Sequence, residues 1–285
     1  ETMANSLTKE EYITFSENLK SEFNVTMLNP LSNELKVMRQ SLLFSGLESI
    51  SYNINRKNSS LKLYEFGKTY HKYERGYQED KHLTLFVSGA KTKDSWTHVS
   101  KNSDFFYLKG IVMSILERIG VTNLKTSSVK SDLFSEGIAF SLGKNKLVEF
   151  GVINKRVLKE FGIKQEVLFA DFDWKSLNEI SGKKKIKVSS LLKFPSVKRD
   201  LALLIDEKVT FKEIYNLSFQ VERNLLKDVG LFDVYQGDKL PEGKKSYAVS
   251  FVLQDSKKTL KDAQIDKIMQ KLQQSFEKNL EAVLR

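Results

Sequence analysis

Cysteine is absent from the 285 residues of this chain, which excludes disulfide bonds, thiolate zinc sites and cysteine nucleophiles. The sequence also has no apolar run long enough to span a bilayer, and its start does not resemble a signal peptide. These absences predict a cytoplasmic protein without a membrane partner. The sequence opens at Glu1 and runs at once into strand-like residues, so we expect it to be a piece of a longer protein.

Sequence patterns for a metal or phosphate site are missing as well. The histidines have no spacing that would place two of them on one helix face; they are His71, His82 and His98. The stretch GIAFSLGKN, residues 137–145, has five residues between its glycines, where a phosphate-binding loop has four. Asn145 also replaces the Ser or Thr that would hold magnesium. We therefore predict a hairpin turn there and no metal site.

The chain is basic, with a formal net charge of +10, which favours a polyanionic partner. Residues 190–285 carry 17 Lys and Arg against 14 Asp and Glu, a net +3, so the remaining +7 lies in residues 1–189. The lysine-rich run GKKKIKV, residues 182–188, predicts a solvated linker, with contact to a phosphate backbone as the alternative. Two domains are expected for this length, and we place them at residues 1–182 and 193–285, joined by a basic linker at 183–192.

The pattern from Lys193 onward predicts a compact domain. Its predicted elements are a strand at residues 197–206, a helix with a capping box at Thr210 and Glu213, a hairpin at 231–251, a helix capped at Thr259 with Asp262, and a short strand at 282–284. The order strand, helix, strand, strand, helix, strand is typical of a ferredoxin-like fold. In that fold two helices cover one face of the sheet and leave the other face open.

The hairpin LFDVYQGDKLPEGKKSYAVSF, residues 231–251, alternates in the manner of two strands. We predict that Phe232 and Val234 point to the helices, which would place Tyr235 on the open face. Its loop contains the glycines and the proline that turns use.

Tyr235 would then share the open face with Ser246, beside the two lysines that end the loop, Lys244 and Lys245. An aromatic ring, a hydroxyl and cations on one sheet face can hold an unstacked nucleobase. An ordinary solvated hairpin is the alternative, and the residues alone do not decide between the two.

The first part of the chain contains more strands than helices, and they do not alternate strictly. The predicted strands are residues 61–70, 81–88, 137–142, 146–153 and 167–173, with helices at 42–55 and 105–119 and a short helix capped by Thr8. This order favours a largely antiparallel sheet flanked by helices. Asp171 and Asp173 lie at a strand end, where Asp173 is predicted to cap the next helix, with acid–base chemistry as the alternative.

Five stretches of the sequence stand out: NPLSNELKVMRQSLLFSGLESISYNINRK, LKLYEFGKTY, DFFYLKGIVMSILERIG, KFPSVKRDLALLID and the hairpin sequence. Together they resemble one family, the beta subunits of bacterial phenylalanine–tRNA ligases. The resemblance implies an α+β chain, in which a class II synthetase-like antiparallel module precedes a ferredoxin-fold anticodon-binding domain. In that family the first module is catalytic-like but inactive, and it packs against the catalytic alpha subunit.

The resemblance also implies roles for particular residues. Tyr235 falls where the family stacks an aromatic ring on an anticodon base, with Ser246 across the hairpin. Phosphate contacts would come from Lys244, Lys245, Lys198 and Arg199. The loop and helix that resemble the class II dimerisation element imply a subunit interface at Pro30, Arg39, Leu42, Leu43 and Leu47.

A working class II site needs an arginine two residues before a glutamate, to neutralise the α-phosphate of ATP. In LKLYEFG that position is Leu63, before Glu65, so no cation is expected beside this carboxylate. The later phosphate-gripping motif is reduced to Gly151 and a downstream Arg156. We therefore expect no catalytic residue in this chain.

The resulting expectation is a non-catalytic part of a phenylalanine–tRNA ligase that packs on the alpha subunit and recognises the tRNA anticodon. ATP and Mg²⁺ would be used by the alpha subunit within a heterotetramer of two alpha and two beta chains, with no cofactor and no DNA bound by this part. The alternatives are a freestanding RNA-binding protein, an active class II ligase and a purely structural role.

Overall fold

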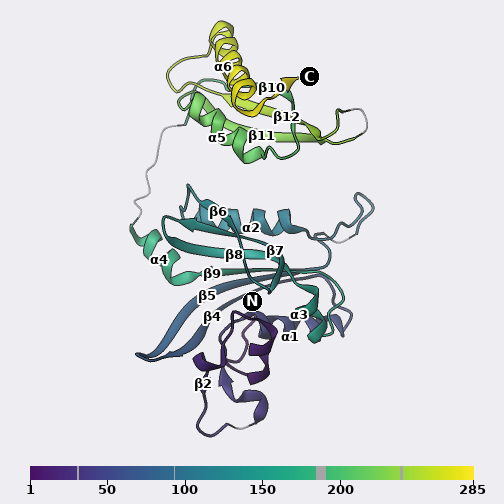
Figure 1. Cartoon of the computed structure of the whole chain (residues 1–285), viewed down its shortest axis with the longest axis vertical. Helices are drawn as coiled ribbons and strands as arrows, with labels where there is room; N and C mark the ends of the chain where they lie inside the picture. Colours follow the sequence, from purple (N-terminus) through teal and green to yellow (C-terminus); the bar gives the residue numbers. More distant parts are fainter. Residues whose placement is uncertain (31, 93, 184–190, 238–239) are drawn as a thin grey trace. The chain divides into compact units, whose positions relative to one another are not determined.

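The structure is a computed structural model of the 285-residue chain, and it describes all residues except 31, 93, 184–190 and 238–239 (Figure 1). The chain divides into two compact units, residues 1–186 and residues 187–285. Most of the expected basic linker, with its lysine run, lies outside the described residues. Within the described part of the chain, no helix has the length and apolar character needed to cross a membrane.

A six-stranded sheet forms the centre of the first unit, and every neighbouring pair in it is antiparallel. In sheet order the strands are β4 (Leu61–Tyr73), β5 (Gly76–Ser88), β9 (Val167–Asp173), β8 (Asn145–Ile153), β7 (Phe134–Leu142) and β6 (Lys125–Ser128). The expected antiparallel sheet is therefore confirmed. Strand β6 was not predicted, because its four residues KTSS are all exposed and carry no apolar alternation.

A tight turn joins β7 to β8 and confirms the predicted hairpin at residues 137–145. Leu142 pairs directly with Asn145, and Gly143 has a φ of 62°, a left-handed angle that glycine adopts without steric cost. Backbone geometry therefore explains this glycine, and no phosphate-binding loop is formed.

Helices cover both faces of this sheet (Figure 1). The first face packs on α2 (Phe105–Arg118) and α4 (Trp174–Lys183), and its core includes Leu85, Leu108 and Phe172. The opposite face packs on α1 (Leu43–Ile54) and α3 (Lys155–Glu160), around Leu47, Phe86 and Phe169. Alternation along β5 sends Leu85 to one core and Phe86 to the other, as period-2 geometry requires.

A small three-stranded sheet precedes α1 in the chain. Its strands are β1 (Leu7–Thr8), β3 (Val37–Met38) and β2 (Val25–Thr26), connected through the 3₁₀ turns η1 (Glu10–Phe15), η2 (Ser21–Phe23) and η3 (Asn33–Leu35). The predicted role of Thr8 as a helix cap is wrong. Thr8 pairs with Val37 in a strand, and the turn that follows begins after Lys9 without a side-chain cap.

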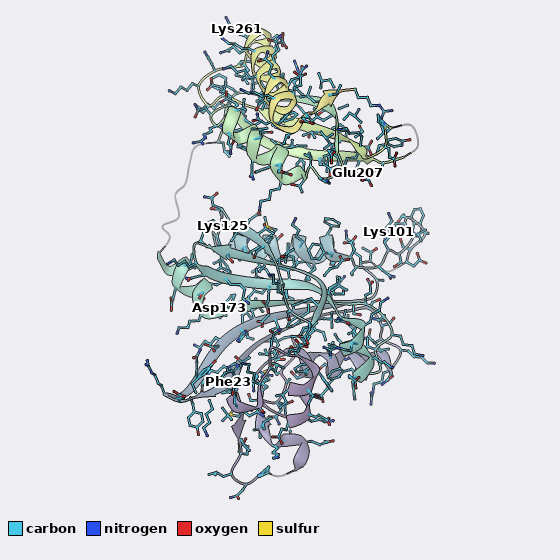
Figure 2. All side chains as sticks on the ribbon, viewed as in Figure 1. Phe23, Lys101, Lys125, Asp173, Glu207 and Lys261 are labelled. Carbon is cyan, nitrogen blue, oxygen red and sulfur yellow. The ribbon has the colours of Figure 1, made fainter. Side chains whose placement is uncertain are left out.

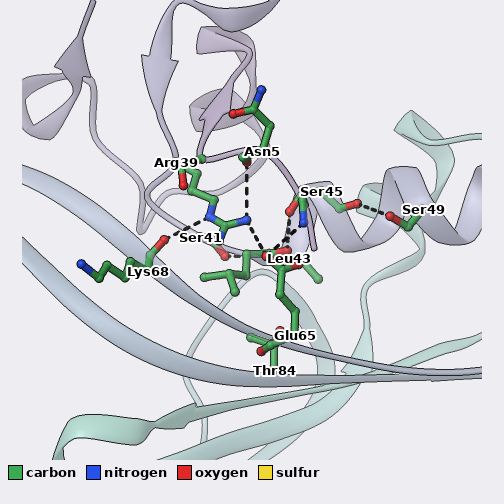
Figure 3. A network of polar contacts seen from close by, with 12 residues as sticks. Asn5, Arg39, Ser41, Leu43, Ser45, Ser49, Glu65, Lys68 and Thr84 are labelled. Atoms are coloured by element: carbon green, nitrogen blue, oxygen red, sulfur yellow. Dashed lines mark hydrogen bonds and ion pairs between the residues drawn. The ribbon is translucent and has the colours of Figure 1, made fainter. Parts of the chain in front are cut away.

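A buried ion pair ties this small sheet to β4 (Figure 3). Arg39 is only 4% exposed, and its Nη1 lies 2.8 Å from Oε1 of Glu65. The same guanidinium donates from Nε to the carbonyl oxygen of Lys68 at 3.0 Å and from Nη1 to that of Asn5 at 3.5 Å. A charge removed from water needs such partners, so Arg39 links three segments of the unit.

The second unit has the predicted ferredoxin-like order. Its elements are β10 (Val197–Asp206), α5 (Phe211–Val221), β11 (Leu226–Tyr235), β12 (Lys244–Leu253), α6 (Asp262–Leu280) and β13 (Val283–Leu284). The strands form one antiparallel sheet in the order β11-β12-β10-β13. The two helices pack together and bury Ile214, Leu272 and Phe276 against Val249 and Phe251 of one sheet face.

Of the two predicted helix caps in this unit, one is confirmed and the other is wrong. Thr210 and Glu213 form the reciprocal capping box at the start of α5. Helix α6 begins at Asp262 after Lys261, without a side-chain cap, so Thr259 does not have the predicted role.

Replacing Gly67 by alanine tests the close packing around the buried ion pair. An added Cβ would lie 2.4 Å from Nη2 of Arg39 and 2.5 Å from Cδ2 of Leu42, so one of them must shift. We expect Gly67→Ala to lower the free energy of unfolding by roughly 1–3 kcal/mol, as overpacked sites do. Both tryptophans, Trp96 and Trp174, lie in the first unit, so denaturant titration followed by tryptophan fluorescence reports on that unit.

The control is Gly110→Ala on the exposed side of α2, where an added Cβ meets no atom within 4 Å. That change should stabilise the helix by about 1 kcal/mol. Equal behaviour of the two variants would contradict the packing argument.

Candidate nucleic-acid interface

A β-bulge in β11 determines which of its side chains lie on the open face of the second sheet. Leu231 pairs with the buried Val249, whereas Tyr235 pairs with Ser246, and the register shifts between Leu231 and Asp233. Directly paired residues share a face, so Leu231 lies on the helix side and Tyr235 on the open side. The shift leaves Phe232 between them as an extra residue.

The predicted orientation of Phe232 is wrong. Its side chain is 57% exposed, and Nζ of Lys198 lies 5.4 Å from its ring centroid. Lys198 pairs with Val252, which alternates with the core residue Phe251, so Lys198 and the ring beside it lie on the open face. Val234 pairs with Tyr247 on the helix side as predicted, but it is 49% exposed at the edge of the sheet.

Tyr235 lies on the open face, away from α5 and α6, and 37% of its surface is exposed. The guanidinium carbon of Arg285, which follows β13, lies 5.6 Å from the ring centroid. The phenol also approaches Gly237, where an added Cβ would lie 3.0 Å from its hydroxyl oxygen. Arg285 therefore lies over the ring and Gly237 lies near its hydroxyl, while part of the ring faces solvent.

Small side chains form the floor beside this ring. Along β12 the open face presents Ser246, Ala248 and Ser250, and the partner of Ala248 in β10 is Ala202. Small side chains let a planar ligand approach the sheet closely. An exposed aromatic ring above such a floor has the geometry that single-stranded nucleic acids use for stacking.

The four cations expected to contact phosphate are divided between the two faces. Lys198 and Lys244 pair with Val252 and Asp206, which places both lysines on the open side. The nearby Lys208 backbone N–H, and then the charges of lysines that include Lys244, lower the pKa of the Asp206 carboxyl. Part of the positive field of Lys244 is therefore balanced by this carboxylate.

Lys245 and Arg199 lie on the helix side, so the predicted place of Lys245 beside Tyr235 is wrong, and Arg199 points away from the open face. Lys245 is buried, and its Nζ lies 4.6 Å from the Tyr247 ring centroid. The same Nζ donates to the carbonyl oxygen of Glu207 at 2.7 Å; Glu207 is labelled in Figure 2. Arg199 faces the start of α6, with Nη2 3.6 Å from Oδ1 of Asp262. Consecutive residues of a strand point to opposite faces. Lys198 and Arg199 therefore lie on different faces of the sheet, and so do Lys244 and Lys245.

The residues expected at a subunit interface have different surroundings. Leu42, Leu43 and Leu47 are completely buried in the core of this chain, so their side chains are not available to another subunit. Arg39 is used by the internal ion pair with Glu65, whereas Pro30 is exposed and stays a predicted contact. The apolar residues of α1 therefore pack into the core of this chain and do not form the predicted subunit interface.

Glu65 has a cation beside it after all, which corrects the expectation drawn from Leu63. The cation is Arg39, which comes from outside β4 and is engaged by Glu65 and two backbone carbonyls. Arg156 likewise pairs with Asp132 at 2.8 Å, and its Nη2 donates to the carbonyl oxygen of Phe15. Both arginines therefore have structural partners within the chain.

A polar cluster on the first sheet was not visible from sequence spacing. Nδ1 of His82 lies 2.7 Å from Oδ1 of Asp171, and its Nε2 lies 3.0 Å from the hydroxyl of Thr69. These residues come from three neighbouring strands, and only the fold brings them together. Thr69 is buried, which leaves its hydroxyl inaccessible to a substrate. Asp171 also borders a cavity of about 430 Å³.

Burial alone would lower the pKa of His82, but its contact with Asp171, helped by Asp80 and Asp173, raises that pKa above its usual value. Asp173 also has its predicted capping role, because its Oδ1 accepts the backbone N–H of Ser176 at 2.9 Å. In the described part of the chain, no three His, Cys, Asp or Glu residues are grouped so as to hold a metal ion.

Two family models match the chain. Residues 1–174 match the phenylalanyl tRNA synthetase beta chain CLM domain, and residues 193–285 match the ferredoxin-fold anticodon binding domain. The phenylalanine–tRNA ligase beta subunit of Bacteroides thetaiotaomicron is 46% identical over 297 residues, and that of Porphyromonas gingivalis is 42% identical over 299. Each match covers all of this chain and 36% of the relative, so the chain spans about a third of their length.

Among solved structures, a pyrrolysyl-tRNA synthetase from Desulfitobacterium hafniense superposes with a TM-score of 0.48 and 14% identity. That superposition covers 64% of this chain and 62% of the other.

The raised pKa of His82 predicts a pH-dependent stability of the first unit. A raised folded-state pKa stabilises the fold fully below the unfolded value of about 6.5, and this contribution is lost as the pH rises through the folded value. We expect the free energy of unfolding of the wild-type chain, minus that of His82→Gln, to fall across this pH window. Denaturant titrations followed by tryptophan fluorescence at a series of pH values measure this difference.

Asp171→Asn should reduce the same pH dependence, because it removes the carboxylate that raises the His82 pKa. His98→Gln, in an exposed loop, serves as the control. A pH profile of His82→Gln parallel to that of the wild type would contradict the assignment.

Proposed function

This chain belongs to the phenylalanyl-tRNA synthetase beta chain family, and on that premise we propose that it forms the anticodon-recognising part of a phenylalanine–tRNA ligase. The whole enzyme would attach phenylalanine to its tRNA in an ATP-dependent reaction in the cytoplasm. In this proposal the second unit holds the anticodon on its open sheet face, and the first unit is a non-catalytic body that packs on the alpha subunit.

The observation that carries the proposal is the position of Tyr235. Its ring lies on the sheet face opposite the helices, partly exposed, above the small side chains of β12 and across from Ser246. Stacking of one base on an aromatic ring contributes about 1–3 kcal/mol and does not depend on a particular base edge. Ser246 pairs with Tyr235 but is only 8% exposed, so we propose its hydroxyl as donor and acceptor only for a base that reaches the floor of the site.

Charge contributes less at this face than stacking does. Of the four proposed phosphate contacts, Lys198 and Lys244 have the right orientation, and Asp206 lies beside Lys244. Exposed cations act on phosphate mainly through salt-dependent attraction. With a net +3 over residues 190–285, we expect this unit alone to bind tRNA weakly and to depend on the rest of the enzyme for affinity.

The ion pairs of the first unit support a non-catalytic role. Arg39 and Arg156 are engaged within the chain, and Leu63 supplies no charge to neutralise a phosphate. We therefore assign amino-acid activation, with ATP and Mg²⁺, to the alpha subunit in a heterotetramer of two alpha and two beta chains. Pro30 and the exposed residues around it are our proposed contacts with that subunit.

A freestanding RNA-binding protein is the alternative, and the likeness of the entire chain to ligase beta subunits favours the ligase. Co-purification of the full-length protein with a catalytic alpha chain separates the two, because only the ligase requires that partner.

Tyr235→Ala in the full-length beta subunit, assembled with the alpha subunit, tests the proposed stacking. We expect the KM for tRNA in aminoacylation to rise roughly 5- to 150-fold, the equivalent of about 1–3 kcal/mol. Phenylalanine-dependent ATP–pyrophosphate exchange should not change, because activation does not involve the anticodon. Tyr235→Phe should stay close to wild type, since the ring supplies the stacking surface.

Tyr215→Ala is the matched control, because Tyr215 is 40% exposed but lies on α5, on the other side of the sheet. It should leave the KM for tRNA unchanged. The proposal fails if Tyr235→Ala and Tyr215→Ala give the same KM.

A further inference from the structure

The proposed site around Tyr235 leaves a second exposed aromatic ring on the same face unexplained. Phe232 is 57% exposed although it belongs to a paired strand, and Nζ of Lys198 lies over its ring at 5.4 Å from the centroid. A lone exposed phenylalanine is common and means little. Here, however, the ring shares one sheet face with Tyr235 and carries its own cation, so two ring and cation pairs lie along this face.

The bulge is what allows both rings to face the same way. Phe232 and Tyr235 are three residues apart, and in a regular strand an odd separation places side chains on opposite faces. The register shift between Leu231 and Asp233 leaves Phe232 as an extra, unpaired residue, so Phe232 and Tyr235 point to the same face. Leu231 stays packed against the core. A bulge that re-aims side chains in this way is typical of functional sites.

We propose that Phe232 is a second nucleobase platform, which stacks a neighbouring base of the strand whose other base rests on Tyr235, while Lys198, on the side of Phe232 away from Tyr235, places a cation beside that second base. The inference rests on the proposed function of the Tyr235 site and extends it to a second nucleotide. The ligand class is an unstacked single strand. Phe232 lies between the positions of Val249 and Ala248 and Tyr235 pairs with Ser246, so the two rings are separated by about 7–10 Å along the strand, whereas stacked bases repeat at about 3.4 Å.

The surroundings of Phe232 favour a base over a bare phosphate as its ligand. Gly230 and its partner Ser250 lie next to Phe232 on the open face. Gly230 has no side chain, and an added Cβ would lie 3.0 Å from the Ser250 hydroxyl, so few side-chain atoms rise above the sheet there. Asp200 and Asp228 also lie on the open face on either side of this pair. Their carboxylates repel a phosphate group, whereas an aromatic ring attracts the face of any base.

The matched variants come from the same strand. Phe232→Leu keeps an apolar side chain but removes the aromatic ring, and Phe232→Trp keeps an aromatic platform. Val234→Ala is the control, because Val234 is similarly exposed at 49% but belongs to the helix side. In the assembled full-length enzyme, we expect Phe232→Leu to raise the KM for tRNA roughly 5- to 150-fold, with Phe232→Trp and Val234→Ala near wild type.

Fluorescence locates the second base directly. The probe is tRNA carrying 2-aminopurine at one anticodon-loop position at a time, titrated with the assembled enzyme. We expect quenching at two neighbouring positions, one lost in Phe232→Leu and the other lost in Tyr235→Ala. Circular dichroism and the size of the assembled enzyme should be unchanged, which separates lost stacking from misfolding.

Each outcome decides the inference separately from the proposed function. If Tyr235→Ala raises the KM for tRNA while Phe232→Leu does not, the second platform is wrong and the proposed function stands. If neither variant changes it, both fail. If Phe232→Leu instead impairs assembly with the alpha subunit, the ring is a protein contact and the inference is overturned.

Discussion

The bulge in β11 is the constraint on which the proposed recognition surface depends. It lets Leu231 pack into the core while Phe232, Asp233 and Tyr235 remain on the open face. In a regular strand Leu231 and Tyr235, four residues apart, would point to the same face. Leu231 could then not be buried while Tyr235 points outward. The extra residue resolves that conflict at an edge strand, where an unpaired residue costs least.

A different constraint shapes the first unit, where polar side chains on its six-stranded sheet bind to other groups of the same chain. The carboxylate of Glu65 is bound by Arg39, and Gly67 leaves the space into which that guanidinium fits. Both groups are buried, and removing one partner of such a pair is strongly destabilising, so the pair has a structural role. The charges of this unit therefore maintain its fold.

Local patterns in the sequence predicted the elements well, because alternation, helical periodicity and capping depend on neighbouring residues. Strand β9 and the capping box of α5 appear where they were predicted. The bulge, the burial of Lys245 and the His82–Asp171 contact could not be predicted in this way. The bulge depends on how β11 pairs with β12. The contact of Lys245 with Glu207 joins residues 38 positions apart, and the His82–Asp171 contact joins residues 89 positions apart, so only the tertiary structure brings them together.

The central claim is that an aromatic ring, with little help from charge, holds the nucleic acid at this face. The salt dependence of tRNA recognition tests it most directly, because the slope of log KM against log salt reports phosphate contacts and a stacked base does not contribute to it. When the wild-type enzyme is compared with Tyr235→Ala, we expect two parallel lines, with the variant displaced to higher KM at every salt concentration. Lines that coincide, or a variant line with a reduced slope and no displacement at low salt, would contradict it.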